Sequence, residues 1–167
     1  MNKKELEQLP QAGDVIFTER KNFKGLPIPY RHYGIYIGYK QVIHFRPPKG
    51  CEEINSSQAD IIQTTLDEFL NGDELFVESV RDNFKFKPFP AQEVIERAKS
   101  KLGKYKGRYR LLFNNCEHFA HWCKYGIPFS WQVRKFVRKA TGTAMSVAAV
   151  AAVVYREYKK SQKDDRI

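Results

Sequence analysis

The order of strand-like and helix-like segments predicts an α+β fold with a small antiparallel sheet packed against helices. Two β-rich runs, residues 32–37 and 42–46, are joined by Gly38-Tyr39-Lys40-Gln41, which is a hairpin signal. Farther along the chain, apolar residues recur at helical spacing over 91–102, and a second helix is expected from Cys116 to Tyr125. Strands followed by helices are typical of α+β domains.

The other elements of the N-terminal half are shorter. Residues 13–18 read as a strand, and residues 20–31 form a basic loop that contains Gly25, Pro27 and Pro29. Residues 51–64 are polar and are expected to be irregular. Leu66 to Leu70 forms a helical turn, and the alternation from Leu75 to Val80 predicts a further strand.

Helix boundaries are marked by capping residues. Gly103 ends the helix that begins at Ala91, and Asn115 can cap the helix that begins at Cys116. Gly126 and Pro128 close this second helix.

The composition excludes several classes of protein. A chain of 167 residues with 42% hydrophobic and 29% charged residues is long and apolar enough for one folded domain, which excludes a disordered tail protein. Three cysteines make a disulfide framework unfavourable and favour a reducing compartment. The first ten residues lack an apolar core segment, so we expect no secretory signal.

The net charge of +10 favours an anionic partner, either a nucleic acid or a phospholipid surface. Residues from Val133 onward carry +6 of this charge, whereas a nucleic-acid-binding domain usually spreads its charge over a folded face. We therefore expect a glycerophospholipid membrane as partner and no nucleic acid. The basic residues of this tail are Arg134, Lys135, Arg138, Lys139, Arg156, Lys159, Lys160, Lys163 and Arg166.

The predicted hairpin carries two histidines, His32 and His44. One register places the apolar Tyr33, Ile35, Ile37, Ile43 and Phe45 on one face and puts both histidines with Gly34 on the other. Neighbours on paired strands lie within roughly 8 Å, so the two imidazoles are close in this register. The alternative is two unrelated polar residues on a solvated sheet face.

Cys116 lies in the first turn of the predicted helix that follows Asn115. Unpaired N–H groups and the helix dipole favour a thiolate there, and a backbone N–H can also bind a developing oxyanion. The alternative is a small buried apolar residue, which is the common fate of a free cysteine. Cys123 is expected to pack, and Cys51 has no evident role.

Cys116, His118, His121 and Cys123 also form a cluster of metal-ligand residue types. At about 100° per residue the two cysteines point one way and the two histidines point away from them, so one helix cannot wrap all four around zinc. We expect no metal and no cofactor, and we expect His118 and His121 to be packing or surface residues.

Three motifs resemble the lecithin:retinol acyltransferase family, and most of all its short phospholipase A/acyltransferase (H-ras-like suppressor) branch. They are His-Tyr-Gly-Ile-Tyr-Ile-Gly at 32–38, Val-Ile-His-Phe at 42–45 and Asn-Cys-Glu-His-Phe at 115–119. The segment 124–134 and the apolar tract after it are also similar to that branch. The resemblance covers roughly residues 10–155.

The resemblance implies a permuted papain-like (NlpC-type) fold in which the histidines precede the cysteine. It implies that Cys116 is the nucleophile, His32 the general base and His44 the orienting third member. Tyr30 also matches the branch. Arg46 replaces a small residue after the second histidine motif and is a candidate contact for a lipid phosphate, so Tyr30 and Arg46 are the expected substrate-binding residues.

The sequence divides into a catalytic domain at 1–130 and a basic-flanked C-terminal membrane-anchor helix and tail at 131–167. Ala140 to Tyr155 contains no charge, and its sixteen residues span about 24 Å as a helix, less than a hydrocarbon core of about 30 Å. Small residues at four-residue spacing suit a weak helix–helix association. The alternative is a soluble helix packed on the domain. With the anchor, the catalytic domain is expected on the cytoplasmic face of an intracellular membrane.

Together these features predict a membrane-associated phospholipase A1/A2 and acyltransferase with a cysteine thioester intermediate. The acyl chain passes from a glycerophospholipid to water, to an amine such as that of phosphatidylethanolamine, or to a lysolipid. One alternative is a cysteine peptidase or amidase on the same fold. A second alternative is a non-catalytic membrane adaptor.

Overall fold

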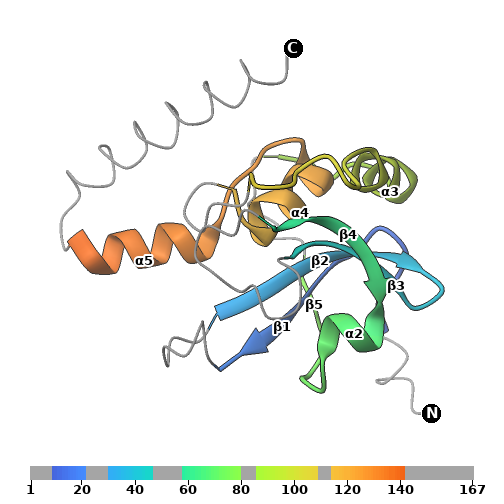
Figure 1. Ribbon diagram of the computed structural model, residues 1–167. Coiled ribbons are helices and arrows are strands. Elements are labelled where there is room, and N and C mark those ends of the chain that lie inside the picture. The colour runs from blue at the N-terminus through green and yellow to red at the C-terminus, as the bar shows by residue number, and fades with distance from the viewer. Residues whose placement is uncertain (1–8, 22–29, 47–57, 80–85, 109–113, 142–167) are drawn as a thin grey trace. The chain divides into compact units, whose positions relative to one another are not determined.

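The computed structural model describes residues 9–21, 30–46, 58–79, 86–108 and 114–141. In these ranges a five-stranded antiparallel sheet has the strand order β4-β3-β2-β1-β5 (Figure 1). The α+β prediction with a small antiparallel sheet is confirmed. The strands are β1 (Val15–Arg20), β2 (Tyr30–Gly38), β3 (Gln41–Arg46), β4 (Asp60–Thr65) and β5 (Phe76–Val77).

The hairpin of β2 and β3 positions the candidate site, and its predicted register is confirmed. Gly34 pairs with His44, and Ile35 pairs with Ile43. Tyr39 and Lys40 both have positive φ, 50° and 54°, as the turn of a tight hairpin requires. Because side chains alternate along a strand, this register puts the isoleucines on one face of the sheet and the histidines on the other.

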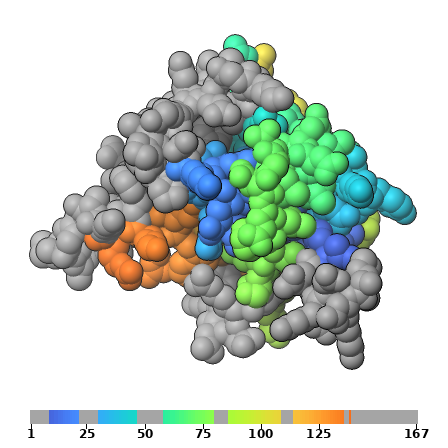
Figure 2. All heavy atoms as spheres, turned by 90° about the horizontal axis from the view of Figure 1, so that it is seen from below, coloured from blue at the N-terminus to red at the C-terminus, as the bar shows by residue number. Residues whose placement is uncertain are grey.

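Two sets of helices cover the two faces of the sheet. On the face of Ile35 and Ile43 lie α3 (Ala91–Ser100) and α4 (Cys116–Tyr125), with Val94, Ala98, Phe119 and Ala120 in the same core cluster. On the opposite face, α2 (Leu66–Leu70) packs Phe69 against Ile16 and Val42. Figure 1 shows α3 and α4 above the sheet and α2 below it, and Figure 2 views the molecule from the side of α2.

Several element boundaries differ from the prediction. The segment 51–64 was expected to be irregular, but residues 60–65 form β4, because their backbone pairs with β3 at the edge of the sheet. β1 runs over 15–20 rather than 13–18, β5 has only two residues, and α3 ends at Ser100. The turn at Leu66–Leu70 is confirmed, and a capping box between Thr65 and Glu68 fixes its start. Cys51 lies outside the described residues.

The chain divides into two compact units, Met1–Phe129 and Ser130–Ile167. The second unit begins with α5 (Trp131–Thr141), in which Val133 N–H and Arg134 N–H bond to Ser130. The remainder of the apolar tract, residues 142–155, lies outside the described residues. Among the helices that the structure does describe, none has the length and apolar character to cross a bilayer. The anchor helix and the permuted papain-like connectivity stay predictions.

Candidate active site

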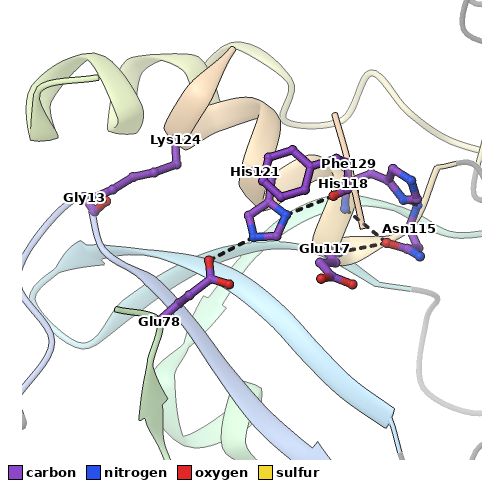
Figure 3. A network of polar contacts seen from close by, with 8 residues as sticks. All are labelled: Gly13, Glu78, Asn115, Glu117, His118, His121, Lys124 and Phe129. Atoms are coloured by element: carbon purple, nitrogen blue, oxygen red, sulfur yellow. Dashed lines mark hydrogen bonds and ion pairs between the residues drawn. The ribbon is translucent and has the colours of Figure 1, made fainter. Parts of the chain in front are cut away.

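The N-terminus of α4 holds Cys116 in a defined position. The side-chain oxygen of Asn115 accepts hydrogen bonds from the backbone N–H groups of Glu117, at 3.0 Å, and His118, at 3.1 Å (Figure 3). The N–H of Asn115 in turn donates to Nδ1 of His118 at 3.4 Å. Asn115 is thus the N-cap of α4, as predicted. The reciprocal cap keeps the turn that carries the thiol from fraying.

The Cys116 sulfur lies against the backbone of β2. Its Sγ is 4.0 Å from the carbonyl oxygen of Arg31, and the side chain is 3% exposed. Burial raises the pKa of the thiol to about 12, although hydrogen bonds from the backbone N–H groups of Tyr33, Glu117 and Cys116 itself lower it. At neutral pH the resting group is therefore a thiol, surrounded by the backbone donors that a thiolate or an oxyanion would need.

His32 and His44 form a direct pair. His32 Nε2 and His44 Nδ1 are 2.8 Å apart, and the rings meet edge to face. His32 also stacks on Phe69 of α2 at a centroid distance of 5.2 Å. With exposed fractions of 8% and 0%, the two rings are buried. The alternative of unrelated residues on a solvated face is therefore wrong.

Both histidines are uncharged at neutral pH. Burial, aided by the positive charges of Arg20 and Arg46, lowers the pKa of His32 to about 3. Burial also lowers the pKa of His44, and the neighbouring His32 adds to that effect. A neutral imidazole has a free lone pair, so the pair is in the protonation state that a general base needs.

Cys116 and the histidine pair approach β2 from different sides. Cys116 belongs to the core cluster of the α4 face, whereas His32 and His44 contact Phe69 on the α2 face. Within the described residues no hydrogen bond joins Cys116 to His32. The pairing of β2 with β3 stops at Gly34, while that with β1 continues to Tyr30. The sulfur and the imidazole are thus both next to the start of β2.

Two threonines beside the histidines were missed by sequence reasoning. Thr64 Oγ1 lies 3.0 Å from His44 Nε2, and Thr18 pairs with His32 across β1 and β2. Thr18 is fully buried, and among the described residues its hydroxyl is the one buried side-chain polar atom without a partner. No local motif marks either threonine, because strand pairing alone brings them to the histidines.

The expected substrate-binding residues flank the histidine pair. Tyr30 is the first residue of β2 and, two positions before His32, lies on the same face of the strand. Arg46 ends β3, and its charge is close enough to lower the pKa of both histidines. The described residues thus place an aromatic ring and a cation on the His32 side of the sheet.

The two histidines of α4 are structural. His118 is 4% exposed, and burial lowers its pKa to about 3. His121 is fully buried and bridges Glu78 and the carbonyl of Phe129, each at 2.9 Å (Figure 3). The packing assignment therefore holds, and the surface alternative is wrong. Cys123 is also buried in the core. No metal-binding group of three or more ligand side chains occurs in the described ranges.

The α+β domain thus carries a cysteine at a helix N-terminus and two paired histidines on adjoining strands.

Comparison with known proteins identifies the family. Residues 8–129 match the model of the family described as lecithin retinol acyltransferase, and the chain belongs to this family. It is 33% identical over 162 residues to mouse (Mus musculus) phospholipase A and acyltransferase 3, covering 92% of this chain and 95% of that protein. The human (Homo sapiens) protein of the same name is 30% identical over 151 residues, with 86% and 88% covered. Rat (Rattus norvegicus) lecithin retinol acyltransferase is 32% identical over 143 residues, with 74% and 58% covered.

Proposed function

We propose that this protein is a phospholipase A and acyltransferase that removes a fatty acyl chain from glycerophospholipids through a thioester on Cys116. The observation that carries the proposal is the position of the sulfur, in the first turn of α4 and 4.0 Å from the carbonyl oxygen of Arg31 on the strand that carries His32. Family membership supports acyltransferase and phospholipase A chemistry.

In the first half-reaction His32 accepts the Cys116 proton, and the sulfur attacks the ester carbonyl carbon. The N–H groups at the start of α4 stabilise the negative charge on the carbonyl oxygen. The C–O bond to the glycerol breaks, and the imidazolium of His32 returns its proton to the departing lysophospholipid. His44, bonded to Nε2 of His32, holds the ring in place while the ring is charged.

In the second half-reaction an acceptor attacks the thioester. Water gives a free fatty acid, the amine of phosphatidylethanolamine gives an N-acyl lipid, and a lysolipid gives a new diacyl lipid. His32 takes the proton of the acceptor and passes it to the departing sulfur, which regenerates the Cys116 thiol and the neutral imidazole.

This chemistry requires the Cys116 sulfur and the His32 ring to approach each other at the start of β2. Catalytic hydrogen bonds commonly form only when substrate is bound, so the resting separation is compatible with the role. Arg46, near the histidine pair, is our candidate for contact with the lipid phosphate. Tyr30 is our candidate for contact with the glycerol or acyl region of the same lipid.

The deciding experiment is mass analysis of the intact protein after incubation with vesicles of a labelled phosphatidylcholine. We expect one acyl adduct, located on Cys116, and its loss in Cys116→Ala together with hydrolysis and transfer. Cys123→Ala is the matched control, because Cys123 lies on the same helix and in the same core cluster but about two turns away from the helix N-terminus. Full activity in Cys116→Ala would refute the proposal.

Two alternatives make different predictions in the same experiment. A cysteine peptidase or amidase would cleave peptide substrates and leave the phospholipid intact. A membrane adaptor would bind the vesicles without an adduct. The buried histidine pair favours an enzyme over an adaptor, because holding two neutral imidazoles in contact has no evident value for a docking surface.

We also propose that residues from about 134 onward tether the catalytic domain to the cytoplasmic face of an intracellular membrane. Support comes from sequence alone, namely the uncharged tract between two basic clusters. A chain truncated after Ser130 should move from the membrane pellet to the supernatant and still cleave micellar substrate. Continued pelleting of the truncated chain with vesicles at high salt would place the tether elsewhere.

A further inference from the structure

The second histidine of the pair has a partner on a third strand. His44 Nε2 lies 3.0 Å from the hydroxyl of Thr64 on β4, and His44 Nδ1 lies 2.8 Å from Nε2 of His32. Both nitrogens of the His44 ring are therefore engaged, one by a hydroxyl and one by the other histidine. Which nitrogen carries the proton depends on what the hydroxyl does with its own proton.

The Thr64 hydroxyl donates to the carbonyl oxygen of Thr65 at 3.2 Å. A carbonyl oxygen can only accept, and a hydroxyl has a single proton. When the hydroxyl proton is donated to this carbonyl, the hydroxyl offers a lone pair toward His44, and His44 Nε2 carries the proton between them. A neutral imidazole carries only one such proton, so Nδ1 of His44 is an acceptor.

The same reasoning extends to His32. Because Nδ1 of His44 accepts, Nε2 of His32 donates, and the lone pair of the neutral His32 ring is on Nδ1. In the described part of the chain no hydrogen bond is made to this Nδ1. Nδ1 is bonded to Cγ, the ring carbon attached to Cβ, so it is the ring nitrogen nearer to the backbone of β2, against which the sulfur also lies.

We infer that Thr64 is a positioning residue that sets the tautomers of both histidines and thereby directs the basic lone pair of His32 to Nδ1. This role rests on the thiol chemistry proposed above. In the first step the Sγ–H bond breaks and its proton forms the Nδ1–H bond of His32. The positive charge then stays on the His32 imidazolium, whose Nε2–H continues to donate to His44.

The surroundings of Thr64 hold its hydroxyl in this role. Thr64 pairs with Val42 in the β3–β4 register, which puts it on the face of His44. Thr65, whose carbonyl accepts the proton, is the N-cap of α2. Its backbone N–H donates to Glu68 at 3.0 Å, and its hydroxyl accepts from the Glu68 N–H at 3.2 Å. The acceptor is therefore fixed by a helix cap.

The experiment compares Thr64→Val with Thr64→Ser in the full chain. Valine keeps the shape and removes the hydroxyl, so we expect kcat for phospholipid hydrolysis to fall about tenfold with KM unchanged. Serine should restore most of the rate. Gln63→Ala is the control, because Gln63 is exposed on the opposite face of the same strand and should leave the rate unaltered.

Nitrogen-15 NMR of the histidine rings gives a readout that does not depend on turnover. In the wild-type chain His44 should be protonated at Nε2 and His32 at Nε2, and Thr64→Val should mix the tautomers of His44. Protonation of wild-type His44 at Nδ1 would overturn the inference even if Thr64→Val does not fold. An unchanged tautomer and kcat in Thr64→Val would also overturn it, whereas failure of the thiol chemistry would show separately as activity in Cys116→Ala.

Discussion

Replacing Gly34 by alanine would add a methyl group on the face of the sheet that carries the histidines, toward Phe69 of α2. An added Cβ would lie 2.6 Å from Cγ1 of Val42, 3.0 Å from Cε2 of Phe69 and 3.3 Å from Cβ of His44. Gly34 does not have a positive φ, so an alanine would fit the backbone and only the lack of space opposes it. The position tests whether the close packing around the histidine pair is required.

The cost follows from these contacts. An ordinary contact needs at least 3.4 Å, but Val42 and Phe69 are almost completely buried and have little room to withdraw. Overpacking a core costs about 1–3 kcal/mol, against which replacing a strand glycine by alanine returns about 0.5–1 kcal/mol. We expect a net loss of about 1–2 kcal/mol of unfolding free energy, which is a fall in Tm of about 2–8 °C for a chain of this size.

The assay is urea unfolding of Gly34→Ala, of Val42→Ala and of the double variant. Val42→Ala alone should destabilise by leaving a cavity, but in the double variant the new methyl group occupies that space. The loss of unfolding free energy in the double variant should therefore be smaller than the sum of the losses in the two single variants. The rate of acyl-enzyme formation should fall in Gly34→Ala, since the methyl group presses on His44. A stable, fully active Gly34→Ala with additive free energies would refute this reasoning.

Three other perturbations test the surroundings of the site. Asn115→Ala removes the cap of α4 and should lower the free energy of unfolding by about 1 kcal/mol, measured by thermal unfolding. Asn115→Asp should be close to wild type. Equal stability of the wild type and both variants would show that the cap is dispensable. Thr18→Val should raise stability by about 1 kcal/mol, because the wild-type hydroxyl is buried without a partner; a loss instead would reveal a partner, such as a water beside His32. Burial lowers the pKa of His32 and His118 to about 3, so below pH 6.5 the unfolded state binds more protons than the folded state. The free energy of unfolding should therefore fall as the pH drops from 6.5 toward 3, by at most about 1.4 kcal/mol per pH unit for each histidine. Urea unfolding at pH 7 and pH 5 checks this, His118→Gln should flatten the slope, and a pH-independent stability would contradict it.

The hairpin could be predicted because its information is local. The apolar side chains of β2 and β3 alternate strictly, so a slip of one residue would expose Ile35 and Ile43, and only one register avoids this. The same register brings His32 and His44 together. The start of α4 was equally predictable, because Asn115 is a strong cap and Gly126, with φ 77°, is a strong stop.

The parts that could not be predicted depend on long-range contacts. β4 has the sequence DIIQTT, in which apolar and polar residues do not alternate clearly. It forms a strand because its backbone pairs with β3. The hydrogen bond between His121 and Glu78 joins residues that are 43 positions apart. For the same reason no sequence pattern reveals that Thr64 and Thr18 lie beside the histidines.

The start of β2 connects the two halves of the proposed chemistry. The segment from Arg31 to Tyr33 supplies the carbonyl that contacts the thiol, an N–H that favours the thiolate, and the His32 imidazole. Burial keeps both reacting groups uncharged at rest, since it raises the pKa of the thiol and lowers that of the imidazole. In the proposed mechanism, an ion pair between them is therefore unfavourable in the resting site, because charge separation in a closed apolar site is costly. On the proposed mechanism we therefore expect proton transfer to accompany substrate binding, and the buried thiol to react slowly with general thiol reagents when no substrate is bound.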